Sequence, residues 1–338
     1  MEIIQNQSLL KLNTFRVDAK AKYFTVIKSE NDLKEILKTD LFIQNKFLVL
    51  GSGSNILFTK DFDGLIIKNE ISGIKKINET EDTVEIEVGG GVEWDDFVLY
   101  SVENKFYGVE NLVMIPGKVG AAPIQNIGAY GTEVKDTISK VKGILISSGE
   151  KKEFSNSECC FGYRDSIFKK ELKGEIIITS VVFTLSKKKS VNIGYGSLKS
   201  EFEKQNISDP DITDVYNVIK KVRTEKLPGV EEIGSAGSFF KNPVIKREKL
   251  LEIQKDFPEI VFYEIDENSV KLPAAWLIDK CGFKGKRAGD TGTYKNQALV
   301  IVNYNKATGK EIEEFSVQIK NAVLEKFGVE ITPEVNIF

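Results

Sequence analysis

The chain has 338 residues, of which 41% are hydrophobic and 29% charged; this balance is typical of globular proteins, and the length allows two or three domains. A net charge of -3 gives no general attraction to nucleic acid, whose binding needs clustered Lys and Arg. No apolar run has the length of a signal peptide core or a membrane-spanning helix, so we expect a cytoplasmic protein that binds neither nucleic acid nor membrane.

The first half of the chain predicts strands that alternate with helices. Ser29 and Asp32 suit a variant capping box for a helix whose inner face carries Leu33, Ile36 and Leu37. Apolar or alternating runs predict strands at residues 23–28, 46–50, 64–68, 83–88, 141–147 and 175–185. Residues 93–105 predict a helix, and a long glycine-containing loop follows over residues 107–133.

The second half predicts helices at residues 209–224, 247–255 and 274–280 and a strand at residues 298–303. Thr308 and Glu311 form a capping box for a last helix, which Gly328 ends. The buried stripe of that helix consists of Ile312, Phe315, Ile319 and Val323. The fold class is therefore α+β, with domain borders near residues 70 and 208.

Two glycine-rich segments are candidates for binding a nucleotide. Residues 51–55, Gly-Ser-Gly-Ser-Asn, follow an apolar strand; their N–H groups can converge on a phosphate, or the segment is an ordinary tight turn. Residues 115–131 combine glycines and prolines with amide side chains, which suits either a rigid cofactor wall or a structural Ω-loop.

Three further segments carry groups that suit catalysis. Arg164 can grip a carboxylate with two hydrogen bonds, although an arginine beside Asp165 is often a plain ion pair. Residues 234–238, small and followed by two phenylalanines, predict backbone pressed against a flat ligand or a buried turn. Glu334, near the end of the chain, is by itself an ordinary solvated carboxylate.

The chain contains no histidine. This excludes Ser-His-Asp and Cys-His catalysis, His-ligated metal sites and flavin linked through histidine. The three cysteines, Cys159, Cys160 and Cys281, are odd in number and include an adjacent pair, so neither a disulfide framework nor a metal site is expected. Proton transfer must therefore use Ser, Tyr, Lys, Cys or a carboxylate.

Taken together, four segments resemble the UDP-N-acetylenolpyruvoylglucosamine reductase family, the MurB family, in its type I branch. The matches occur in the family's order at residues 51–55, 123–131, 161–166 and 237–243. The resemblance implies an FAD-binding module of the vanillyl-alcohol-oxidase (PCMH) type, followed by a C-terminal α+β substrate domain. It divides the chain into FAD subdomain 1 (1–70, joined by 328–338), FAD subdomain 2 (71–208) and a substrate-binding domain (209–327).

The resemblance also implies non-covalent FAD, with NADPH as the reductant and UDP-N-acetylglucosamine enolpyruvate as the substrate, which becomes UDP-N-acetylmuramate in peptidoglycan precursor synthesis. The implied FAD-binding residues are Gly51, Ser52, Gly53, Ser54, Asn55, Pro116, Gly117, Gln125, Asn126, Gly128, Ala129, Tyr130 and Gly131. Ser238 matches the family's proton donor. Arg164 matches the arginine that stabilises the enediolate-like charge, and Glu334, protonated or hydrogen bonded, shares that task. We expect a monomer.

The substrate contacts that the resemblance implies are Tyr163, Tyr195, Lys226, Asn242 and Gln297. Tyr195 matches the mobile tyrosine that covers the UDP part of the substrate, although it is equally a plain loop tyrosine by its sequence alone. One position departs from the pattern, because Tyr294 stands where some members of the family carry a histidine. This departure puts one ligand contact in doubt and leaves the three catalytic positions unchanged.

Two other functions compete with this interpretation. An FAD oxidase on the same fold would attach its flavin through a cysteine, and Cys159 and Cys160 are the candidates. A nucleotide-binding regulatory protein would have no use for Arg164, Ser238 and Glu334 together. Strict dependence of NADPH consumption on the enolpyruvyl UDP sugar separates the three functions.

Overall fold

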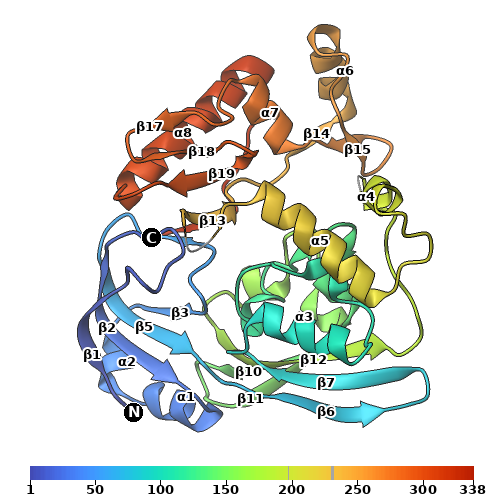
Figure 1. Ribbon diagram of the computed structural model, residues 1–338. Helices are drawn as coiled ribbons and strands as arrows, with labels where there is room; N and C mark the ends of the chain where they lie inside the picture. The colour runs from blue at the N-terminus through green and yellow to red at the C-terminus, as the bar shows by residue number, and fades with distance from the viewer. Residues whose placement is uncertain (197, 230–231) are drawn as a thin grey trace. The chain divides into compact units, whose positions relative to one another are not determined.

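The computed structural model describes residues 1–196, 198–229 and 232–338, which form two compact units (Figure 1). Unit 1 consists of Met1–Gln7, Lys22–Ser52 and Asp63–Arg223, and unit 2 of Ser8–Ala21, Gly53–Phe62 and Thr224–Phe338. The predicted mixture of helices and strands is confirmed. The division into three domains with borders near residues 70 and 208 stays a prediction.

Unit 1 is built on two sheets. The first has the order β1 (Ile4–Ser8), β2 (Lys20–Ile27), β5 (Phe62–Asn69) and β3 (Phe47–Leu50). The second has the order β11 (Lys151–Ser155), β10 (Ile138–Leu145), β12 (Ile176–Ser186), β7 (Thr83–Gly89) and β6 (Ile74–Glu79). One apolar core joins Ile144 and Ile177 of the second sheet to Ile27 and Leu65 of the first. The two sheets of unit 1 therefore share their buried surface.

The helices of unit 1 begin where the sequence supplies caps. The Ser29 side chain accepts a hydrogen bond from the Asp32 N–H at the start of α1 (Glu30–Ile36), as predicted, and Thr39 caps α2 (Asp40–Gln44). α3 (Trp94–Glu103) packs Trp94 and Phe97 against Phe183 of β12, with ring centroids 6.0 and 4.5 Å apart. This aromatic cluster fixes the segment that follows α3.

The predicted loop at residues 107–133 is built from short turns. It contains the 3-10 turns Glu110–Leu112 and Val119–Ala121 and the small hairpin of β8 (Gly128–Ala129) and β9 (Thr132–Glu133). Further 3-10 turns lie at Val134–Asp136, Ser157–Cys159 and Ile167–Lys169. The helices α4 (Leu198–Lys204) and α5 (Ile212–Lys226) follow β12.

Unit 2 has a sheet of β13 (Gly234–Ser238), β19 (Gln297–Asn303), β18 (Thr291–Tyr294) and β17 (Arg287–Ala288), with α7 (Ala274–Lys280) and α8 (Gly309–Phe327) against it. A smaller sheet joins β14 (Val244–Lys246), β16 (Ser269–Lys271) and β15 (Tyr263–Glu264) beside α6 (Arg247–Asp256). β20 (Asn336–Ile337) pairs in parallel with β4 (Ile56–Leu57). The predicted capping box of Thr308 and Glu311 and the end of α8 at Gly328 are confirmed.

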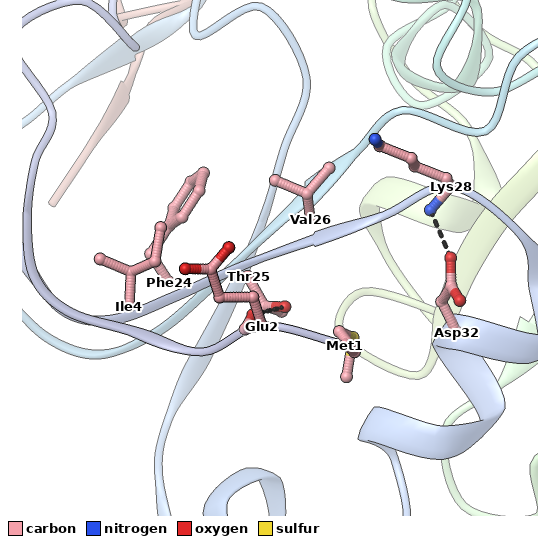
Figure 2. A pocket seen from close by; sticks show the side chains of 8 residues that line it. All are labelled: Met1, Glu2, Ile4, Phe24, Thr25, Val26, Lys28 and Asp32. Atoms are coloured by element: carbon pink, nitrogen blue, oxygen red, sulfur yellow. Dashed lines mark hydrogen bonds between the residues drawn. The ribbon is translucent and has the colours of Figure 1, made fainter.

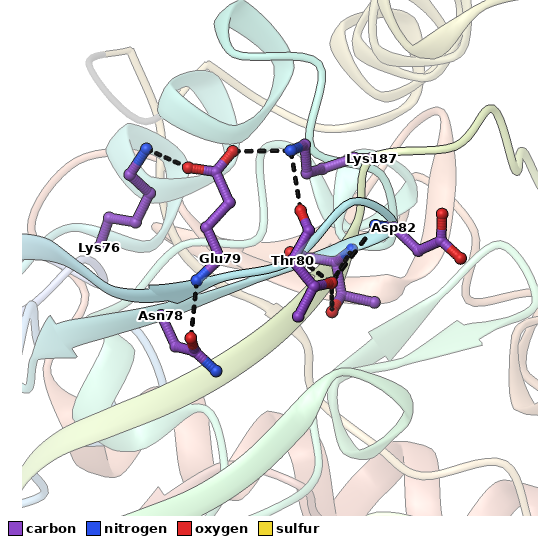
Figure 3. A network of polar contacts seen from close by, with 7 residues as sticks. Lys76, Asn78, Glu79, Thr80, Asp82 and Lys187 are labelled. Carbon is purple, nitrogen blue, oxygen red and sulfur yellow. Dashed lines mark hydrogen bonds and ion pairs between the residues drawn. The ribbon is translucent and has the colours of Figure 1, made fainter.

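An exposed ion-pair network ties the β6–β7 hairpin to the end of β12 (Figure 3). The Glu79 carboxylate contacts the Lys76 ammonium at 2.5 Å and the Lys187 ammonium at 2.8 Å. Lys187 also donates to the Thr80 carbonyl at 2.9 Å. Hydrogen bonds from Lys187 and Lys76 lower the pKa of Glu79 to about 2.

We expect the substitution Glu79→Gln to lower the melting temperature slightly at pH 7, because it removes both ion pairs. The folded-state pKa lies below the unfolded value of about 4.3, so the contribution is present above that pH and is lost as the pH falls toward 2. Thermal melts at pH 7 and pH 3.5 should therefore show the gap to wild type closing. Glu81→Gln is the matched control, since Glu81 lies in the same hairpin and makes no ion pair with the described residues; equal melts for both variants at pH 7 would contradict the prediction.

Candidate active site

Gly51 and Ser52, the first two residues of the predicted cofactor segment 51–55, lie against the second predicted cofactor segment, residues 115–131, within unit 1. The Ser52 hydroxyl donates to Glu93 at 2.9 Å, and Glu93 forms an ion pair with Lys118 at 2.7 Å. Lys118 is buried and also pairs with Glu70 at 3.2 Å. Burial opposes its charge, but the hydrogen bonds that its ammonium donates to these two carboxylates outweigh that effect and raise the pKa of Lys118. A Cβ on Gly51 would lie 3.1 Å from the Lys118 Cγ, so glycine lets the two segments approach.

The backbone at Ser52 and Gly53 has the donors that a phosphate needs. Gly53 has φ +65°, and a Cβ there would lie 2.1 Å from the Leu12 carbonyl oxygen, so this position requires glycine. Within residues 1–196, 198–229 and 232–338, the N–H groups of Ser52 and Gly53 donate to no protein acceptor. Two adjacent uncommitted donors fit an anionic phosphate of a dinucleotide.

The second predicted cofactor segment lies on helix α3 and ends in a tight hairpin. The Gly117 carbonyl accepts from the Trp94 N–H at 2.9 Å; Pro116 precedes it, and Gln125 lies between the Val119–Ala121 turn and β8. Tyr130 and Gly131 connect β8, which contains Gly128 and Ala129, to β9. Both have positive φ, 49° and 78°, as a type I′ hairpin turn requires.

Asn126 fastens the predicted catalytic arginine turn to this segment. Its fully buried amide donates to the Gly162 carbonyl at 2.9 Å and to the Glu133 carboxylate at 3.1 Å. Its oxygen accepts from the Lys135 N–H at 3.1 Å. Both amide hydrogens are therefore used within the protein, and this geometry holds the Gly162–Asp165 turn in place.

Arg164 lies in that turn with φ 55°, an uncommon conformation for a residue other than glycine. Its guanidinium donates to the Gly128 carbonyl at 2.8 Å and lies 5.5 Å from the ring centroid of Tyr163, which is exposed. The neighbouring Asp165 forms an ion pair with Lys170. The strained turn thus places the guanidinium beside the β8–β9 hairpin.

Tyr130 is the centre of a polar and aromatic cluster that sequence analysis only partly identified. Its ring meets that of Tyr195 edge to face at 6.0 Å, and burial raises the pKa of its hydroxyl. Arg223 of α5 hydrogen bonds to Tyr130 and donates to the Met114 carbonyl at 3.0 Å. The buried Nε of Arg223 has no hydrogen-bond partner among the described residues. The sequence offered no signal for Arg223 beyond a charged residue at the second-last position of a predicted helix.

In unit 2, Ser238 and Glu334 lie on adjacent strand segments. The Glu334 N–H donates to the Phe239 carbonyl at 2.7 Å, so the glutamate lies across from the residue that follows Ser238. Residues 234–238 form strand β13 and not the buried turn that was one of the two predictions, with a bulge between Ser235 and Ser238 that leaves Ser238 exposed. The Asn55 amide donates to the Glu334 carbonyl at 3.4 Å, next to Ser54. Unit 2 therefore brings the predicted acid, its carboxylate partner and the end of the first cofactor segment together.

The other predicted substrate contacts also lie in unit 2. Asn242 accepts from the Ala274 N–H at 2.9 Å and so caps α7, while Gln297 accepts from the Leu299 N–H at 3.3 Å. Lys226 is exposed at the end of α5, and Tyr294 pairs with Gln297 across β18 and β19. The side-chain oxygen of Asn242 is thus committed to the protein.

A pocket of about 350 Å³ in unit 1 lies beside β1 and β2 and contains no predicted site residue (Figure 2). Its Asp32 carboxylate accepts from the Lys28 N–H at 2.7 Å, a hydrogen bond that lowers the pKa of Asp32 and belongs to the start of α1.

No helix in the described parts of the chain is long and apolar enough to cross a membrane. The same residues contain no cluster of three or more metal-ligating side chains.

Comparison with known proteins identifies the family. A model of the UDP-N-acetylenolpyruvoylglucosamine reductase C-terminal domain matches residues 229–338, and an FAD-binding-domain model matches residues 21–155. The reductase of that name from Flavobacterium johnsoniae is 49% identical over 338 residues, with both chains fully covered. The chain belongs to the UDP-N-acetylenolpyruvoylglucosamine reductase family. The Bacteroides fragilis reductase is 43% identical over 98% of this chain and 99% of its own.

These relationships confirm the predicted family, fold class and FAD cofactor. The crystal structure of the reductase from Thermus caldophilus superimposes with a TM-score of 0.67 at 22% identity, over 100% of this chain and 98% of that one, which shows the shared fold. The glycine backbone at residues 51–53 fits an FAD phosphate by its donors, as described above. The individual site residues stay predictions.

Gly53→Ala should weaken FAD binding strongly, because the new Cβ would clash with the Leu12 carbonyl oxygen and disturb the donors at residues 52 and 53. Fluorescence titration of apoprotein with FAD measures the affinity. Gly149→Ala is the control: this glycine also has positive φ, at 70°, but nothing lies within 4 Å of the position its Cβ would occupy. If the two variants bind FAD equally well, residues 51–55 are not the phosphate site.

Proposed function

We propose that this chain uses NADPH to reduce UDP-N-acetylglucosamine enolpyruvate to UDP-N-acetylmuramate, a step of peptidoglycan precursor synthesis. The observation that supports this proposal is the hydrogen bond from the Glu334 N–H to the Phe239 carbonyl, because it puts Glu334 across from the residue that follows the exposed Ser238. FAD, when bound, supplies the hydride relay between NADPH and the enolpyruvyl group. The residues of the chain then have to stabilise the negative charge that develops on the substrate and to donate one proton to it.

Negative charge grows on the substrate carboxylate when hydride adds to the terminal carbon of the enol ether. Arg164 is the residue we assign to that charge, because its guanidinium is fixed by the Gly128 carbonyl and a guanidinium can hold a carboxylate with two hydrogen bonds. Glu334 shares this task through a hydrogen bond. Aimed charge of this kind accelerates a reaction by about 10²–10³.

Ser238 then donates a proton to the adjacent carbon. A serine hydroxyl is a weak acid, but the acceptor is a strongly basic carbanion, so the transfer is downhill. The bulge in β13 orients this serine outward while Phe239 and Phe240 remain buried, which separates the proton donor from the core. No histidine is needed in any of these roles.

We assign Tyr163, Tyr195, Lys226, Asn242 and Gln297 to the UDP part and the nicotinamide. Tyr163 and Tyr195 are 40% and 43% exposed, so both rings have surface available for a ligand. Lys226 supplies a cation for the diphosphate. We further propose that the protein acts in the cytoplasm as a monomer and without nucleic acid.

Ser238→Ala should keep NADPH-driven bleaching of the flavin and lose reoxidation by the UDP sugar by about 10²–10⁴ in rate, because only the second half-reaction needs the proton donor. Stopped-flow absorbance of the flavin follows each half separately. Ser235→Ala, in the same strand, is the matched control, and Glu334→Gln should impair the same half-reaction as Ser238→Ala. Normal reoxidation in Ser238→Ala would remove this serine from the mechanism.

We expect the flavin to be bound without a covalent link. Burial raises the pKa of the Cys159 thiol to about 12, so this cysteine stays protonated and is a poor nucleophile toward a flavin. Acid precipitation should leave the yellow colour in the supernatant. A yellow pellet would favour an oxidase that tethers its cofactor, with the exposed Cys160 as the attachment point.

A further inference from the structure

Two asparagines join the segment that carries Tyr195 to the predicted FAD segment. We name residues 191–196 the Tyr195 segment. The Asn111 amide donates to the Asn192 carbonyl at 2.8 Å and to the Tyr130 carbonyl at 3.0 Å. The Asn192 amide donates back to the Gly131 carbonyl at 3.0 Å. Three hydrogen bonds therefore connect the Tyr195 segment, directly or through Asn111, to the β8–β9 turn.

Asn111 is built to make this connection. It is 1% exposed, and both hydrogens of its amide are used, one on each segment. It lies in the turn Glu110–Leu112, between buried apolar neighbours Val109 and Leu112. A buried amide is stable only with its hydrogen bonds made, so Asn111 favours the arrangement in which the Tyr195 segment is docked.

The contact surface beneath Tyr195 depends on Gly131. A Cβ on Gly131 would lie 3.2 Å from the Tyr195 Cβ and 3.4 Å from the Asn192 amide nitrogen. The edge-to-face contact of the Tyr130 and Tyr195 rings, at 6.0 Å, adds an apolar component. The Tyr195 segment therefore rests on the two residues, Tyr130 and Gly131, that are assigned to the cofactor.

We propose that Asn111 and Asn192 are positioning residues that couple the FAD site to the binding of the UDP sugar. The inference rests on the proposed function, which assigns Tyr195 to the substrate and the β8–β9 turn to FAD. FAD that orders Tyr130 and Gly131 also orders the platform on which the Tyr195 segment docks. By linkage, the same interaction makes the UDP sugar strengthen the binding of FAD.

The test uses Asn192→Ala, a surface change that removes the hydrogen bond to Gly131 and keeps the fold. Calorimetric titration with UDP-N-acetylmuramate, the product, gives its affinity for apoprotein and for FAD-loaded protein. We expect the wild type to bind the product more tightly when FAD is present. In Asn192→Ala we expect this ratio to fall by about fivefold or more, the lower end of typical coupling between sites. NADPH-driven flavin bleaching should keep its wild-type rate.

Asn156→Ala is the matched control. Asn156 is an exposed asparagine of unit 1 whose amide also bridges two backbone carbonyls, those of Lys135 and Ile138, both at 2.8 Å. It should retain the wild-type ratio. Equal ratios for Asn192→Ala and Asn156→Ala would overturn the coupling.

Asn111→Ala provides a second measurement, with its folding checked by circular dichroism. A folded variant should show the same loss of coupling as Asn192→Ala, and if this variant does not fold, Asn192→Ala alone decides the proposal. The proposed function is judged separately from wild-type turnover of the enolpyruvyl UDP sugar. If the wild type binds FAD but reduces no UDP sugar, that function fails, and the coupling is then judged by whether Asn192→Ala binds FAD more weakly than Asn156→Ala.

Discussion

An irregular segment can be buried only when its backbone carbonyl and N–H groups find partners, and the region 107–133 meets this requirement with side-chain amides. Asn111 and Asn126, both buried, donate to carbonyls on segments far away along the chain. Their hydrogen bonds replace the ladder that a sheet would supply. The arginine turn and the Tyr195 segment both depend on them, so the predicted site in unit 1 is positioned by two buried asparagines.

In unit 2, pairing between strand segments positions the predicted site residues. The bulge of β13 turns Ser238 outward, and the N–H of Glu334 continues the pairing beyond it. Ser238 and Glu334, held by backbone hydrogen bonds, move less than they would on a free loop. The chain contains no histidine, and the roles proposed for these two residues need none.

The sequence predicted correctly the helix caps and the helix end, whose causes lie within a few residues of the feature. Ser29 and Thr308 cap their helices, and Gly328 ends α8 with φ 62°, because each acts on neighbours within a few residues. Strand β20, the strand conformation of residues 234–238 and the role of Arg223 were missed. Each depends on a partner distant in the chain, which periodicity and capping rules do not report. The family was recognised from four motifs in the family's order, none of them specific by itself, and site residues outside these motifs, such as Glu334 and Tyr195, came only from the resemblance.

The pairing of β20 with β4 also has a consequence for the position of Glu334. The Thr59 N–H donates to the Phe338 carbonyl at 2.7 Å, and the Phe338 ring meets those of Phe58 and Phe62, both at 6.2 Å. Residues 333–334 pair with residues 239–240, and residues 336–337 pair with β4, so backbone pairing holds the segment on both sides of Glu334. A change in β4 would therefore be transmitted to Glu334 through the backbone of unit 2, although the two lie far apart in the chain.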